Sequence, residues 1–154
     1  MTPLAWLALS TLAFEPNLGQ TDPQVQFLAR GPGYTLFLTS TEAVVARPGG
    51  AVRMKLAGAN PAPRLVPLEP QAGYSSYALG SWRGRAPRYG RLRYERVYPG
   101  IDLVYYGRQG ELEYDLVVAP GADPRVIRLA FDGVRDVRLE GSGDLVLESA
   151  RLAR

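Results

Sequence analysis

Three carboxylates at alternate positions are the residues of this sequence best placed to do chemistry. Glu111, Glu113 and Asp115 alternate with less polar neighbours, so an extended strand would put all three on one face. Positions two apart on a strand are separated by about 6.5–7 Å, and the paired carboxyls of glycoside hydrolases lie roughly 5–9.5 Å apart. Crowded carboxylates raise each other's pKa, which can supply a general acid. The pattern predicts Glu113 and Asp115 as a catalytic pair, with Asp102 of the preceding strand assisting.

The same acidic row has two other interpretations. It is typical of a solvated strand face whose carboxylates pair with arginines, and Arg93, Arg108 and Arg128 are the candidates. Carboxylate ligands also suit calcium, which is a hard cation. A hydrolase requires a cleft over the strand, whereas a solvated face requires only water and counter-charges. We favour the solvated face and keep catalysis and calcium binding as alternatives.

A second stretch, residues 82–96, combines arginines with aromatic rings. Guanidinium groups bind anions in bidentate fashion, and aromatic rings stack on sugars or bases. The stretch therefore suits an acidic glycan or, as a weaker alternative, a nucleic acid. Alternation of arginine with Leu92 and Tyr94 is equally typical of an ordinary outer strand face. The candidate ligand-binding residues are Trp82, Arg85, Arg88, Tyr89, Arg91 and Tyr106, the last because Tyr105 and Tyr106 must point to opposite faces.

The composition excludes much other chemistry. The chain of 154 residues contains no Cys and no His, which removes Cys/His zinc sites, thiol nucleophiles, Ser-His-Asp triads and imidazole bases. We therefore expect no cofactor, with calcium as the metal that the remaining oxygen ligands suit. The formal net charge of +3 is too small an excess to indicate a nucleic-acid partner by itself.

Period-two alternation recurs along the chain and predicts strands with one buried face. The clearest case is 52–56, where three apolar residues alternate with Arg53 and Lys55. Four prolines between Gly58 and Pro70 indicate an extended connector or an edge strand. Turn signals at intervals of about eight to twelve residues, without a long helical stripe, predict an all-β antiparallel β-sandwich in one domain. The expected strands are 24–29, 34–39, 42–47, 52–56, 74–79, 88–94, 101–106, 111–118, 127–131, 134–139 and 145–148.

Residues 1–13 form an apolar segment ahead of this domain, which spans 14–154. No Lys or Arg precedes the apolar run, so there is no clear signal peptide, and the run is too short to span a bilayer. We expect the segment to pack on the domain, with one short helix from Pro3 onward, and keep a remnant export signal as the alternative. The polar block Glu15–Gln20 is expected to cap the chain's entry into the sheet with hydrogen bonds.

Three blocks of the sequence resemble a known family. They are FEPNLGQTD at 14–22, VYPGIDLVYYG at 97–107, and the segment 112–124 with LEYD and VAPGADP. In this order they resemble the uncharacterised N-terminal domain that precedes SBBP-type β-propeller repeats in bacterial cell-surface proteins, from about Phe14 to Leu147. The resemblance implies an exported, modular protein that is extracellular or at the cell surface, with propeller domains following in the chain. It implies no activity.

Two classes of function follow from these observations. The first is a non-catalytic structural or adhesion module that binds polysaccharide or cell-surface glycan, as the resemblance and the missing catalytic residue types suggest. The second is an acid/base glycoside hydrolase that uses Glu113 and Asp115 with Asp102. We favour the first class, and nucleic-acid binding through the arginine stretch is the weaker third option.

Overall fold

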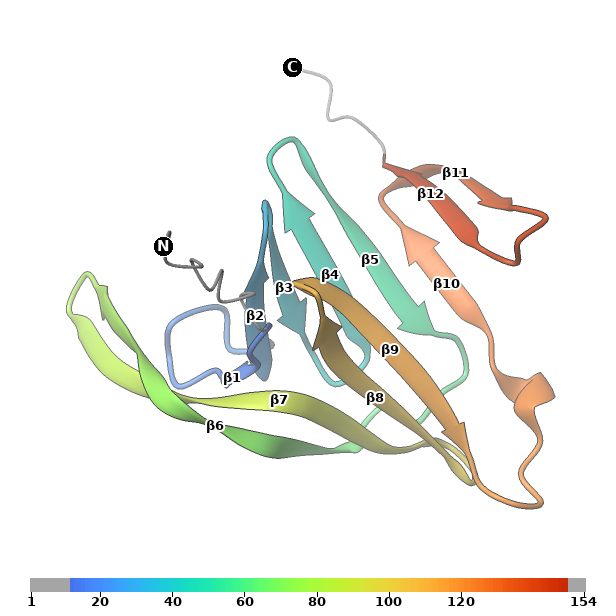
Figure 1. The fold of residues 1–154 in the computed structure, drawn as a ribbon, viewed down its shortest axis with the longest axis horizontal. Coiled ribbons are helices and arrows are strands. Elements are labelled where there is room, and N and C mark those ends of the chain that lie inside the picture. Colours follow the sequence, from blue (N-terminus) through green and yellow to red (C-terminus); the bar gives the residue numbers. More distant parts are fainter. Residues whose placement is uncertain (1–11, 150–154) are drawn as a thin grey trace, which may run out of the picture.

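Strands dominate the computed structural model, which describes residues 12–149. Two antiparallel sheets pack together, and a two-stranded hairpin follows them (Figure 1). This confirms the predicted all-β, antiparallel class. The six-stranded sheet contains, in spatial order, β1 (Glu15–Pro16), β2 (Phe27–Gly31), β3 (Tyr34–Leu38), β4 (Glu42–Arg47), β5 (Gly50–Leu56) and β10 (Leu129–Asp132). The four-stranded sheet contains β6 (Arg64–Leu79), β7 (Trp82–Tyr98), β8 (Ile101–Arg108) and β9 (Glu111–Val118), and the hairpin pairs β11 (Val134–Leu139) with β12 (Leu145–Ser149). A 3-10 turn, Pro124–Val126, precedes β10.

Short Pro-Gly turns connect two of the strand pairs in the six-stranded sheet, β2–β3 and β4–β5. Pro32-Gly33 joins β2 to β3, and Gly33 has a φ of 73°, a conformation that glycine adopts without steric cost. Alternation then decides which face each strand buries. In β5 the apolar positions are half-buried, whereas Arg53 and Lys55 are exposed, as the sequence predicts.

The hydrophobic core lies between the inner faces of the two sheets. Side chains such as Leu36 and Leu92 are fully buried, and burial of each leucine contributes about 1.5–3 kcal/mol. Tyr105 is buried and Tyr106 is half-buried on the opposite face, as predicted for adjacent strand residues. The buried cluster takes Phe27, Ala29, Leu36, Leu38 and Ala43 from one sheet and Leu92, Tyr94, Ile101, Leu103 and Tyr105 from the other.

The strand that the sequence predicts at 127–131, with one buried face, is only partly correct, because β10 spans Leu129–Asp132. Ile127 packs against the core, but Leu129 is 37% exposed. The physical reason is position, because β10 is the last strand of its sheet and pairs only with β5. A strand at the edge of a sheet has a neighbouring strand on one side only, so its side chains are less buried than those of a central strand.

The longest hairpin, β6–β7, extends beyond the sandwich (Figure 1). We call its outer end the arm, which consists of Tyr74–Leu79 in β6 paired with Trp82–Pro87 in β7. A register shift between Gln71 and Tyr74 separates the arm from the rest of β6. The proline-rich stretch that precedes it is an edge strand, one of the two expected forms, since Pro67 and Pro70 lie within β6 at the sheet margin.

The N-terminal segment joins the two sheets. Phe14 exchanges backbone hydrogen bonds of 2.8 and 2.9 Å with Tyr89 of β7, while Glu15 pairs with Leu28 of β2. Leu12 and Ala13, the two described residues of the segment expected to pack on the domain, are buried. The helix expected from Pro3 onward lies outside the described residues. Among the described residues, no helix has the length and apolar character needed to cross a bilayer.

Candidate functional site

The acidic row predicted from the sequence lies on the outer face of the four-stranded sheet. Glu113 of β9 is opposite Tyr106 of β8, and Asp115 is opposite Val104. The Tyr106 hydroxyl is 3.2 Å from Glu113 Oε2 and 3.1 Å from Asp115 Oδ1, so it donates to either carboxylate. Partial burial and the bonded carboxylates of Asp115 and Glu113 raise the pKa of Tyr106. The phenol therefore remains a donor, and the two acids converge on it.

Asp102 makes a backbone contact that the sequence did not indicate. Its Oδ1 accepts a 2.8 Å hydrogen bond from the backbone N–H of Arg96, a residue with a positive φ of 51°. This bond stabilises the irregular backbone between Tyr94 and Tyr98, where the pairing of β7 with β8 shifts register. The structure therefore does not bring Asp102 into the cluster around the Tyr106 hydroxyl.

The acidic row has no basic partners among residues 12–149. No Lys or Arg nitrogen lies within 4.0 Å of a carboxylate oxygen of Glu111, Glu113 or Asp115 in that part of the chain. Arg93, which the sequence suggested as a partner, is 3.1 Å from Glu95 instead. The predicted solvated face is present, but the predicted ion pairs are not.

An open hollow adjoins one end of the acidic row, at Glu111. Glu111 lines an open hollow with Tyr34 and Arg47, and the other hollows described between residues 12 and 149 are lined by residues other than Glu113 and Asp115. Within the same residues, no three side chains of the metal-binding acidic type come together as ligands. The carboxylates instead follow the strand, one at every second position.

Arg91 and Tyr106, both predicted to bind a ligand, contact each other on this face. The guanidinium carbon of Arg91 is 4.9 Å from the centre of the Tyr106 ring, and Arg91 Nε is 2.7 Å from Glu69 Oε1. Arg91 is thus paired with an acid and stacked on the ring at once. The Arg91 guanidinium therefore covers one face of the Tyr106 ring, a face on which a sugar would otherwise stack.

The other predicted ligand residues lie on β7 in different surroundings. Tyr89 packs against the core, and Arg88 is half-buried with its Nε lacking a hydrogen-bond partner in the described structure. Trp82 packs against Gly19, where a Cβ would lie 2.9 Å from the indole nitrogen. Arg85, the last of the predicted ligand residues, is exposed and lies on the outer side of the arm.

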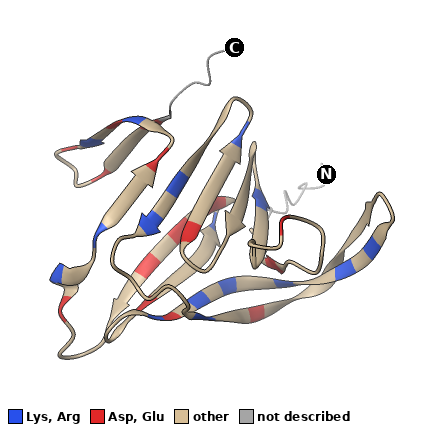
Figure 2. Cartoon of the chain, turned by 180° about the vertical axis from the view of Figure 1, so that it is seen from behind, with Lys and Arg blue, Asp and Glu red and all other residues tan. Residues whose placement is uncertain are grey.

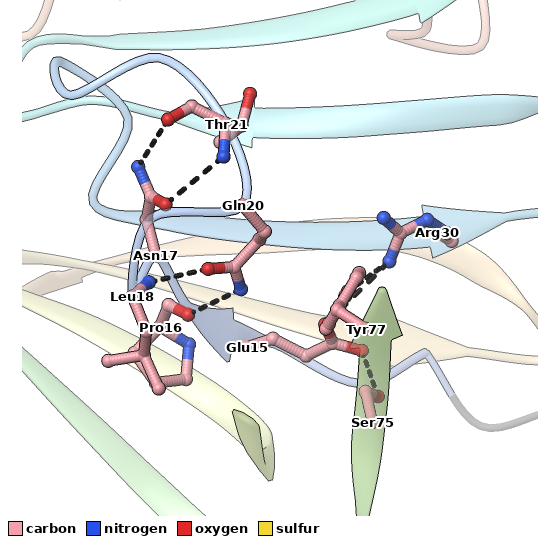
Figure 3. Close-up of polar contacts among 9 residues, drawn as sticks. All are labelled: Glu15, Pro16, Asn17, Leu18, Gln20, Thr21, Arg30, Ser75 and Tyr77. Carbon is pink, nitrogen blue, oxygen red and sulfur yellow. Dashed lines mark hydrogen bonds and ion pairs between the residues drawn. The ribbon is translucent and has the colours of Figure 1, made fainter. Parts of the chain in front are cut away.

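A buried carboxylate holds the arm against the sandwich (Figure 3). Glu15 is 7% exposed, and it accepts hydrogen bonds from the Ser75 and Tyr77 hydroxyls of the arm. The Arg30 Nη1 lies 3.6 Å from Glu15 Oε2 and also donates to the Tyr77 oxygen. Burial, followed by the bond to Glu15, raises the pKa of Tyr77. The cluster links β1, β2 and the arm.

The loop after Glu15 is organised by two amide side chains (Figure 3). Asn17 Nδ2 donates to the carbonyls of Asp22 and Val25, both at 2.8 Å, and Gln20 Nε2 donates to that of Pro16 at 2.9 Å. These bonds confirm the predicted capping role of the block. The loop positions Gly19 beneath the Trp82 indole, where a larger residue would clash.

The outer side of the arm is basic and has no acidic residue. Tyr74 and Ser76 of β6 share a face with Arg83 and Arg85 of β7, because Ser76 pairs with Arg85 and Tyr74 with Pro87. Tyr74 is 64% exposed. The sequence contains no Asp or Glu from 70 to 94, and within residues 12–149 neither arginine has a carboxylate within 4.0 Å. Figure 2 shows basic bands and no acidic band along the arm.

Comparison with known families matches the sequence from residue 14 to residue 151. The chain belongs to the family described as Domain of unknown function (DUF7948). Searches of the curated proteins and of the solved structures each find no match. The match confirms that this is an uncharacterised domain, and a link to β-propeller repeats stays a prediction.

Sequence reasoning about this DUF7948 domain missed the partners of Glu15. The one available signal was an acid directly after the apolar Leu12–Phe14, since a carboxylate in a buried segment needs hydrogen-bond donors. The donors Ser75 and Tyr77 lie about sixty residues further along the chain, and nothing local marks them. Only the path of the arm brings them to Glu15.

Proposed function

We propose that this DUF7948 domain is a non-catalytic adhesion module of an exported bacterial protein that binds acidic glycan through the basic face of the arm. The observation that carries the proposal is the pair Arg83 and Arg85, which have no carboxylate within 4.0 Å among the described residues and lie on a hairpin that extends away from the sandwich. Arginine that lacks a carboxylate partner is free to bind an external anion. Export and surface location rest on the resemblance described above.

The spacing of this face supports a polymeric ligand. Arg83 and Arg85 are two positions apart on β7, which corresponds to about 6.5–7 Å along the strand. Two anionic groups of one polymer can therefore bind to the two arginines at the same time. The exposed ring of Tyr74 offers an apolar surface beside them for a sugar ring. Ser76 adds a hydroxyl on the same face.

A glycoside hydrolase is the less favoured alternative. Glu113 and Asp115 both face the hydroxyl of Tyr106, and no hollow described above has either acid in its lining. Water activation and leaving-group protonation require two carboxyls flanking one bound bond. Both carboxyls instead share the Tyr106 hydroxyl as their hydrogen-bond donor, which makes this the less favoured alternative.

Binding to immobilised polysaccharides tests the proposal. The probes are alginate, a polyuronate, together with neutral dextran and single-stranded DNA. Arg83→Gln with Arg85→Gln is expected to weaken alginate binding by at least about tenfold, since tenfold corresponds to 1.4 kcal/mol and a charged hydrogen bond contributes about 1.5–3 kcal/mol. Arg135→Gln with Arg138→Gln makes the same charge change on the β11–β12 hairpin and is the control.

Equal weakening by the arm variant and the control would show a general charge effect and overturn the proposal. Absence of alginate binding would overturn it as well. Tighter binding of the DNA, with a steep salt dependence, would support the nucleic-acid alternative instead.

A further inference from the structure

The two sheets end in four edge strands, and β9 differs from the other three. Strand β1 has two residues, β10 has four, and β6 carries two prolines and a register shift. Strand β9 has eight residues without proline and pairs with β8 without interruption, from Glu111 opposite Arg108 to Val118 opposite Ile101. Long regular edges present a row of unpaired backbone N–H and C=O groups. Strand β9 is therefore the edge best able to accept another strand.

The side chains of β9 form two rows with different chemistry. On the outer face stand Glu111, Glu113 and Asp115, without a cation within 4.0 Å in the part of the chain that the structure describes. On the inner face, Tyr114 lies between two half-buried leucines and is 37% exposed. An incoming strand would meet negative charge on one face and apolar surface on the other.

The acidic row disfavours a second copy of this chain as the occupant. If two β9 strands paired antiparallel about Tyr114, Glu113 of each would lie opposite Asp115 of the other. Like charges directly opposite each other on neighbouring strands are destabilising. Charge complementarity instead favours a strand that carries Lys or Arg at every second position.

We propose that the β9 edge binds an extended peptide segment of another protein, with basic residues alternating with apolar ones. The backbone of the segment pairs with the free edge of β9, as in other cases of strand addition. Its cations face Glu111, Glu113 and Asp115, and its apolar side chains cover Tyr114. This surface is separate from the basic face of the arm, so the proposal does not depend on glycan binding.

The test uses a short peptide in which lysine alternates with valine, followed by fluorescence anisotropy and by the backbone amide spectrum of the labelled domain. We expect binding, with shifts concentrated at residues 111–118. Glu113→Gln with Asp115→Asn is expected to weaken binding at least tenfold. Asp136→Asn with Glu148→Gln makes the same charge change on the β11–β12 hairpin and is expected to leave binding unchanged.

A second peptide separates strand addition from simple charge attraction. The same sequence, N-methylated on alternate residues, keeps every charge and loses the backbone donors on one edge. The proposal requires that this peptide bind at least tenfold more weakly. Equal binding of both peptides, absence of binding, or self-association of the domain through β9 would each overturn it. Arg83→Gln with Arg85→Gln is expected to bind the peptide normally, whatever its effect on glycan.

Discussion

Removal of a single hydroxyl should loosen the arm from the sandwich. Tyr77 donates a hydrogen bond to Glu15. Because Glu15 is buried, water does not readily replace the donor that is lost with the Tyr77 hydroxyl. A hydrogen bond to a charged group contributes about 1.5–3 kcal/mol, more than a neutral one. In Tyr77→Phe the ring and its packing against Trp82, at 6.0 Å between ring centres, are kept. The loss therefore reports the hydroxyl alone, and we expect a destabilisation of about 2 kcal/mol.

Urea unfolding followed by tryptophan fluorescence measures this loss. The chain has two tryptophans, Trp6 and Trp82, so a Trp6→Phe background leaves the indole that contacts Gly19 as the reporter. A loss of 2 kcal/mol should lower the midpoint by about 1 M urea at a typical denaturant dependence. Amide hydrogen exchange should show the greatest loss of protection in the arm, because the bond links the arm to β1.

Tyr74→Phe is the matched control. Tyr74 lies on the same strand but on the opposite face, and its hydroxyl has no hydrogen-bond partner among the described residues. We expect its removal to change stability by less than about 0.5 kcal/mol. If Tyr77→Phe and Tyr74→Phe are equally stable, the Glu15 cluster does not hold the arm, and the reasoning is refuted.

Two further predictions concern the core. A Cβ at Gly107 would lie 2.4 Å from the Cβ of Leu12, so Gly107→Ala should destabilise the domain by about 1–3 kcal/mol or more in the same urea assay, and wild-type stability would contradict this packing. Burial raises the pKa of both Tyr94 and Tyr105, so the folded state resists ionisation while the unfolded chain ionises near pH 10. Stability is therefore fully present below pH 10 and falls above it by about 1.4 kcal/mol per pH unit for each tyrosine, and Tyr105→Phe should flatten the fall by one such contribution. An unchanged alkaline slope in Tyr105→Phe would show that this tyrosine ionises equally well in both states.

Local patterns were sufficient to predict most strands. Alternation in β5 and β9, and the Pro-Gly turn before β3, depend only on neighbours in the sequence, so 52–56 and 111–118 were recognised directly. Residues 82–87 were not recognised as strand, because arginine, glycine and proline there give no apolar alternation. Their pairing with Tyr74–Leu79 provides the backbone hydrogen bonds that make them a strand.

In the candidate site, too, the sequence predicts which strand face a side chain occupies but not which residues it contacts. Alternation placed Glu113 and Asp115 on one face, and the structure agrees. Alternation could not show that Asp102 bonds to the Arg96 backbone, that Arg93 pairs with Glu95, or that β9 is an edge. These facts depend on which strands become neighbours, and strand order is not a local property of the sequence.

The sequence alone determined that this chain is built from antiparallel strands, that it has no Cys or His chemistry, and that Glu111, Glu113 and Asp115 share one strand face. Tertiary structure alone decided that Glu15 contacts Ser75 and Tyr77, that Arg83 and Arg85 lie on a projecting arm without a carboxylate partner among residues 12–149, and that the acidic row of β9 lies at a sheet edge. The reason is the range of the interactions. Side-chain alternation is fixed by backbone geometry over a few residues, whereas partners and edges are fixed by contacts between segments far apart in the chain.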